Sequence, residues 1–198
     1  MDKNQLPKDF FRKNPLDEIS AAKIADFSIM TLQSDGLNEE IERIVAPGLD
    51  SSRQRSIQQE KENILRLETA QDIVAYMRRT VDPVCASLLC KKALQMQESI
   101  MPLILRRYKT VFIDEFIDLS VRIFGNADPQ YTRQLFDQYK EIRNPYAQAM
   151  ACLLFGEHKI EESIPLLLKE YDRFKAQFPN DSYNQSALFA LYILFGKA

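Results

Sequence analysis

Hydrophobic residues recur at steps of three and four along most of this chain. The clearest run has steps of 4, 3, 4, 3 and 4 and consists of Ile160, Ile164, Leu167, Tyr171, Phe174 and Phe178. A second run with this spacing consists of Phe112, Phe116, Leu119 and Ile123. Such steps place side chains on one face of an α-helix. No stretch alternates apolar and polar residues over six positions, so the pattern predicts an all-α protein without strands.

Asx-Pro dipeptides predict where several helices begin. An aspartate or asparagine at the N-cap accepts a hydrogen bond from a backbone amide, and proline fits the first helical position because its missing N–H needed no partner. The residues predicted to cap in this way are Asn14, Asp82, Asp128 and Asn144, with Asp50 before a further polar helix. The predicted helices span 15–33, 38–46, 52–67, 69–80, 83–96, 98–109, 112–124, 129–142, 145–155, 161–177 and 183–196.

Short loops between these helices favour antiparallel neighbours. The segment 46–52 separates a polar N-terminal part from a more apolar C-terminal part. We therefore predict an N-terminal helical segment over residues 1–50 and a helical repeat region over residues 51–198. A single continuous domain is the alternative.

Three helices of the C-terminal part end in Phe-Gly. These pairs are Phe124-Gly125, Phe155-Gly156 and Phe195-Gly196, spaced 31 and then 40 residues apart. We expect each phenylalanine to anchor the helix end in the core. Each glycine is expected to take the left-handed conformation that follows many helices.

A second internal similarity aligns Glu98 through Tyr108 with Glu162 through Tyr171, each with a proline in the predicted first turn of a helix. The residues Phe155-Gly156, Glu162 and Ile164-Pro165-Leu166-Leu167 resemble the HEAT-repeat family, whose second helices begin with an acidic residue and then Ile-Pro-Leu-Leu. The resemblance covers roughly residues 82–198 and is clearest in the last repeat. Tetratricopeptide repeats are the second choice, because their period is fixed at about 34 residues. The Phe-Gly pairs of this chain are spaced 31 and then 40 residues apart, which is not a fixed period. An irregular helical bundle is the further alternative.

The resemblance implies a HEAT-like α-solenoid of antiparallel helix pairs with an N-terminal helical extension. The second helices of such pairs line a concave face that holds partners. A chain that ends shortly after an apolar helix, here Ala187–Phe195, needs a cover for that helix. The cover could be the N-terminal segment, a partner or a second copy, so a homodimer through this helix is one of the alternatives.

The composition, the apolar runs and the cysteines together indicate where in the cell the protein works. The 198 residues are 45% hydrophobic and 27% charged, with a net charge of −2. The longest apolar run has nine residues, whereas a spanning helix needs roughly 20, so no membrane partner is expected. The cysteines, Cys85, Cys90 and Cys152, are odd in number and lie in apolar stretches, which is typical of reduced thiols. The N-terminus resembles no signal peptide, and we predict a cytoplasmic protein.

Catalytic patterns are missing from the sequence. There is no glycine-rich nucleotide-binding loop, no G-x-S-x-G and no H-E-x-x-H. The only histidine, His158, falls in a predicted turn, and the cysteine spacing does not suit structural zinc. We predict no catalytic residue, metal or cofactor. An enzyme that uses the acidic cluster of Asp114, Glu115 and Asp118 is kept as a third class, with a solvated helix face as the simpler explanation.

Basic residues concentrate between Tyr76 and Thr110, where the net charge is +5. The predicted partner-binding residues are Arg78, Arg79, Lys91, Lys92, Arg106, Arg107 and Lys109. Such segregation of charge favours binding of an anionic partner. Ordinary solvated helix ends are the alternative, because lysine and arginine stabilise the last turn of a helix.

These observations predict a non-catalytic cytosolic scaffold or adaptor that binds an acidic protein or peptide in a solenoid groove. The alternative is a nucleic-acid-associated protein with a basic groove. The family resemblance implies that alternative, because some HEAT-like proteins grip DNA and a subset act in DNA repair.

Overall fold

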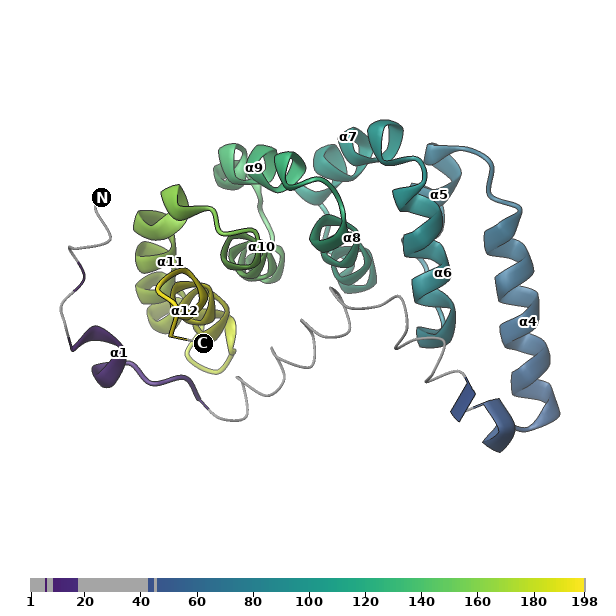
Figure 1. Ribbon diagram of the computed structural model, residues 1–198, viewed down its shortest axis with the longest axis horizontal. Helices are drawn as coiled ribbons and strands as arrows, with labels where there is room; N and C mark the ends of the chain where they lie inside the picture. Colours follow the sequence, from purple (N-terminus) through teal and green to yellow (C-terminus); the bar gives the residue numbers. More distant parts are fainter. Residues whose placement is uncertain (1–5, 7–8, 18–42, 45, 198) are drawn as a thin grey trace. The chain divides into compact units, whose positions relative to one another are not determined.

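The computed structural model describes residues 6, 9–17, 43, 44 and 46–197, and every regular element in these ranges is helical (Figure 1). The predicted all-α class is confirmed for this part of the chain. The predicted helices 15–33 and 38–46 lie mostly outside the described residues. The chain divides into two compact units, residues 1–27 with 128–198 and residues 28–127. The predicted division at residue 50 stays a prediction.

The described residues of one unit, 28–127, include five long α-helices, and we call it the α4–α8 unit. After the 3₁₀ turn η2 (Ala46–Gly48), its helices are α4 (Ser51–Leu65), α5 (Ala70–Tyr76), α6 (Pro83–Leu94), α7 (Gln97–Tyr108) and α8 (Asp114–Asn126). Helix α6 packs between α4 and α8, while α5 packs against α7. Alternate helices therefore form two layers within this unit, as Figure 1 shows.

The second unit, which we call the α9–α12 unit, joins a short N-terminal helix to the C-terminal helices. The elements among its described residues are α1 (Phe10–Lys13), α9 (Pro129–Asp137), η3 (Tyr139–Glu141), α10 (Pro145–Glu157), η4 (Glu161–Ser163), α11 (Ile164–Gln177) and α12 (Tyr183–Leu194). Helix α12 packs against both α10 and α11. Helix α10 is the centre of the core, because every residue from Ala149 to Gly156 is buried.

Four of the predicted N-caps are confirmed. The Oδ1 atoms of Asp82, Asp128 and Asn144 each accept a backbone N–H two residues ahead, at 3.0, 2.9 and 2.9 Å. Asp50 accepts from Ser52 and Arg53 at 2.8 and 2.9 Å. The dipeptides and the cap before α4 thus fix the starts of four helices.

The prediction that Asn14 begins a helix is wrong. Asn14 ends α1, and both its backbone N–H and its side-chain Nδ2 donate to the Phe10 carbonyl at 2.9 Å. Residues 15–17 are not helical. Proline also follows helix ends, because it cannot continue the hydrogen-bond ladder. An Asn-Pro pair alone does not distinguish the two positions.

Two of the three predicted glycine roles are also wrong. Phe124 and Phe155 are fully buried as expected, but Gly125 and Gly156 lie inside α8 and α10. Only Gly196 has a left-handed backbone, with φ of 63°. After α10 the left-handed position belongs to Lys159, with φ of 53°, and Ile160 N–H closes the turn on the Phe155 carbonyl at 2.9 Å. Pro102, expected in a first turn, lies inside α7.

The apolar last helix is covered within its own unit. Between Tyr183 and Phe195 every side chain is buried or half-buried. The Phe11 ring of α1 lies 4.6 Å from the Tyr192 ring and 5.5 Å from the Phe195 ring. Tyr192 Oη donates to the carbonyls of Phe11 and Asn14. The N-terminal segment thus supplies part of the predicted cover, and a homodimer through α12 stays a prediction.

Candidate binding surface

Three of the seven predicted basic residues converge on one groove of the α4–α8 unit. Arg78, Arg106 and Arg107 line it together with Gln71, Val74, Ala75, Leu103 and Thr110. The groove follows the contact between α5 and α7 and has a volume of about 470 Å³. We call it the α5–α7 groove.

Local folding explains why these three arginines face solvent. On α7, Ile104, Leu105 and Tyr108 are buried, which leaves Arg106 and Arg107 on the opposite side of the last turn. Arg78 follows the end of α5, next to the buried Met77. Burial of the apolar faces of two packed helices therefore places three guanidinium groups around the same depression.

The arginines of the groove are available for an anionic ligand. None of the three forms an ion pair or side-chain hydrogen bond with another residue in the described part of the chain. Val74, Ala75 and Leu103 add apolar surface beside these charges. A guanidinium group presents several N–H donors in a plane and binds carboxylates or phosphates with two bonds. The groove therefore combines charge with an apolar lining.

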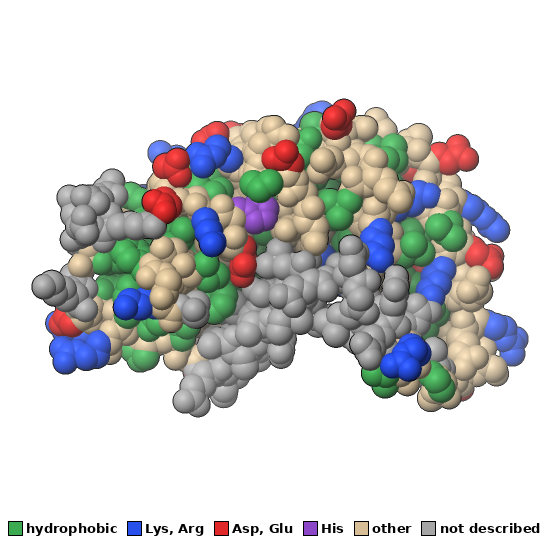
Figure 2. All heavy atoms as spheres, in the orientation of Figure 1, with side chains coloured by type: hydrophobic (Ala, Val, Ile, Leu, Met, Phe, Trp, Pro, Cys, Tyr) green, Lys and Arg blue, Asp and Glu red, His purple; other side chains and the backbone are tan. Residues whose placement is uncertain are grey.

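The other four predicted residues are placed differently. Lys92 donates to the Leu65 carbonyl and so binds the C-terminal end of α4. Arg79 lies over the Tyr76 ring at 5.3 Å and lines a separate depression with Arg66. Lys91 and Lys109 are half-buried, and each has an interaction of its own. Figure 2 shows lysine and arginine side chains over the α4–α6 part of the face in view.

The thiols are not arranged for nucleophilic chemistry. All three cysteines are buried and unbridged. Burial raises the pKa of Cys90 to about 12, against an opposing effect of Arg122, and burial raises the pKa of Cys152 to about 12. A thiol is the nucleophile only as a thiolate, so these two stay protonated near neutral pH.

Among the described residues, no three His, Cys, Asp or Glu side chains are grouped to hold a metal ion. Asp114 and Glu115 of the acidic cluster are exposed, and Asp118 is half-buried. Glu115 accepts a hydrogen bond from Thr80 Oγ1 at 3.2 Å. His158 ends α10 as its C-cap. Within the described helices, none is long and apolar enough to cross a membrane.

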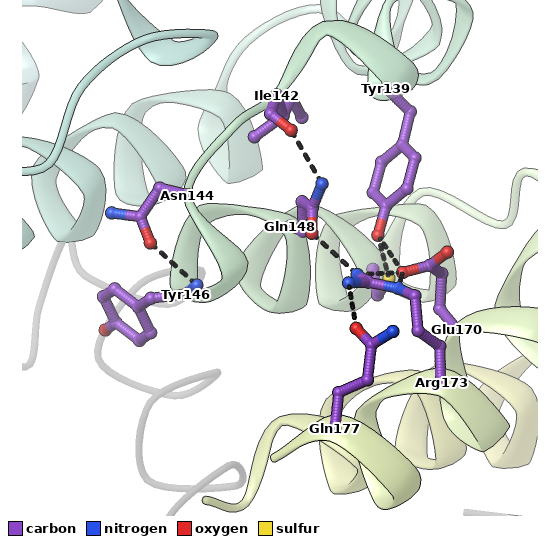
Figure 3. Close-up of polar contacts among 9 residues, drawn as sticks. Tyr139, Ile142, Asn144, Tyr146, Gln148, Glu170, Arg173 and Gln177 are labelled. Atoms are coloured by element: carbon purple, nitrogen blue, oxygen red, sulfur yellow. Dashed lines mark hydrogen bonds and ion pairs between the residues drawn. The ribbon is translucent and has the colours of Figure 1, made fainter.

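Sequence reasoning missed a buried polar cluster in the α9–α12 unit (Figure 3). Glu170 Oε2 accepts from Tyr139 Oη at 3.0 Å and from Arg173 Nε at 2.7 Å. Arg173 also donates to Gln148 at 2.6 Å, and Gln148 donates to the Ile142 carbonyl at 2.7 Å. The cluster joins η3, α10 and α11 through one buried carboxylate.

Each charge of this cluster has a partner. Burial raises the pKa of Tyr139, and Cys152 and Glu170 raise it further. Partial burial alone would lower the pKa of Arg173, but the hydrogen bond and charge of Glu170 give a net increase. Glu170 and Arg173 lie three residues apart on one face of α11. This i,i+3 spacing of opposite charges is the one sequence feature that indicates the ion pair. The cluster therefore stabilises the packing of η3, α10 and α11 against one another.

No protein-family profile matches the chain, and neither a curated protein nor a solved structure is significantly similar to it.

Proposed function

We propose that this protein is a non-catalytic binding module that holds an acidic protein or peptide segment in the α5–α7 groove. The observation that carries the proposal is the convergence of Arg78, Arg106 and Arg107, free of carboxylate partners within the described chain, on a groove with apolar lining. Charge complementarity of this kind steers a partner and selects for its sign.

We propose further that the helices are HEAT-like repeats. Support comes from the α4–α8 unit, where α6 packs between α4 and α8 and α5 packs on α7. In a stack of helical hairpins each helix meets the equivalent helix of the next hairpin, as here. The buried, unbridged thiols fit the proposed cytoplasmic location.

Binding of a labelled acidic peptide, followed by fluorescence anisotropy, tests the proposed function. The variant Arg106→Glu with Arg107→Glu reverses two exposed charges of the groove, and we expect it to weaken binding about tenfold or more, which corresponds to roughly 1.4 kcal/mol. The matched control, Lys140→Glu with Arg143→Glu, makes the same charge change at exposed positions of the α9–α12 unit. It should bind as the wild type does.

Equal binding by the two double variants would reject the groove as the site. A single-stranded oligonucleotide of about 16 nucleotides serves as the competitor. If it binds more tightly than the peptide and loses affinity steeply with salt, the nucleic-acid alternative replaces the proposed function.

A further inference from the structure

Phe112, in the loop between α7 and α8, indicates that the partner needs more than negative charge. The sequence pattern places Phe112 in the apolar stripe with Phe116, Leu119 and Ile123, and those three are buried. Phe112 is 68% exposed, and α8 begins only at Asp114. The sequence pattern groups Phe112 with these three residues on one helix face, but Phe112 lies before the start of α8 and does not share their burial.

Its neighbour Val111 shows why the ring faces solvent. Val111 is 4% exposed and packs into the core, Ile113 has an extended backbone, and in extended chain successive side chains alternate in direction, so Phe112 between them faces solvent. Phe112 is the most exposed large hydrophobic side chain in the described part of the chain, ahead of Ile44 and Leu65. A phenylalanine left in water forgoes the favourable free energy of burying its apolar surface.

Phe112 lies close to the α5–α7 groove. Thr110 lines that groove, and two residues of extended chain span at most about 7 Å between Cα atoms. The Cα of the exposed Phe112 therefore lies within about 7 Å of the Cα of a residue that lines the groove together with Arg107. A single exposed hydrophobic residue is common on protein surfaces, and what distinguishes this one is that it follows Thr110, which lines a groove with three arginines.

We infer that the partner is an acidic peptide segment that also carries a large apolar side chain within a few residues of its carboxylates. The carboxylates bind Arg78, Arg106 and Arg107, and the apolar side chain packs against Phe112. Aromatic and arginine side chains together are the usual anchors of protein interfaces. This inference rests on the proposed function and adds a second requirement to the partner.

Selection from a phage-displayed library of random peptides of about 12 residues tests it, with the purified full chain as bait. We expect the wild-type pool to be enriched in both acidic and large apolar residues. With Phe112→Ala, the acidic enrichment should remain while the apolar enrichment falls about tenfold. The matched control is Leu65→Ala, another exposed apolar residue at 59% exposure outside the groove lining, and it should select the wild-type pool.

The outcomes separate the two levels of the proposal. Acidic enrichment without apolar enrichment, or apolar enrichment that survives Phe112→Ala, overturns the role of Phe112 and leaves the proposed function standing. A pool without acidic enrichment rejects the proposed function and this inference together. Circular dichroism of both variants verifies the fold, which an exposed side chain should not affect.

Discussion

Gly156 allows two helices of the α9–α12 unit to approach closely. A Cβ added there would lie 2.6 Å from the Cα and 2.8 Å from the Cβ of Ala190 in α12. The sequence pattern assigns this glycine to a helix end, but it lies inside α10 and serves helix packing. Spacing along the chain cannot reveal such a role, because the contact comes from a residue 34 positions away.

Gly156→Ala tests this role. Alanine would favour the helix by about 1 kcal/mol, while overpacking costs about 1–3 kcal/mol. We expect a net loss of stability, measured as a lower urea midpoint. Gly48→Ala is the control, because nothing lies within 4 Å of its added Cβ. A Gly156→Ala protein as stable as the wild type would contradict the close approach of α10 and α12.

Helices η3, α10 and α11 are tied together by the cluster around Glu170. This carboxylate is 5% exposed, and its hydrogen bonds from Tyr139 and Arg173 replace those of water. The pattern of apolar positions predicts α11 from residue 161 to 177, and the structure divides this range into η4 and α11. Which polar side chains of α11 are buried depends on the hydrogen-bond partners that η3 and α10 provide.

Removing Arg173 should lower the free energy of unfolding, because it leaves the buried Glu170 carboxylate without a cationic partner. Arg173→Met leaves Glu170 without its cationic partner, and we expect a loss of about 3 kcal/mol in the free energy of unfolding. The double variant Glu170→Gln with Arg173→Met removes the buried charge as well and should be more stable than the single variant. Urea denaturation of both proteins measures the difference. A double variant less stable than Arg173→Met would argue against a buried ion pair.

For the molecule as a whole, the N-terminal segment reaches the C-terminal helices of the same unit. Phe11 contacts Tyr192 and Phe195, and Tyr171 Oη donates to Asn14 Oδ1 at 3.0 Å. Helix α1 has four residues, too few for periodicity to reveal it. Its stability therefore depends on the aromatic side chains against which it docks.

Phe11→Ala should release this segment. The contacts of Phe11 with Tyr192 and Phe195 of the C-terminal part are lost, so hydrogen exchange should speed up at the amides of Lys13 and Asn14 and at the end of α12, with a smaller effect on global stability. The exposed Phe112 supplies the control, because Phe112→Ala should leave these amides unchanged. Unaltered exchange at Lys13 and Asn14 would show that Phe11 does not hold α1.

The sequence alone determined the helical class, the starts of four helices and the concentration of positive charge, because periodicity, capping and charge are local properties. The tertiary structure set which of these residues meet, which face solvent and which lie at helix ends. In the folded chain, Arg78, Arg106 and Arg107 line one groove, whereas Lys92 donates to the Leu65 carbonyl at the end of α4. Phe112 is exposed, whereas Phe116 is buried. The tertiary structure also placed Gly156 against Ala190 and Asn14 at a helix end rather than a helix start. These outcomes depend on which faces meet across distant parts of the chain, and no local pattern carries that information.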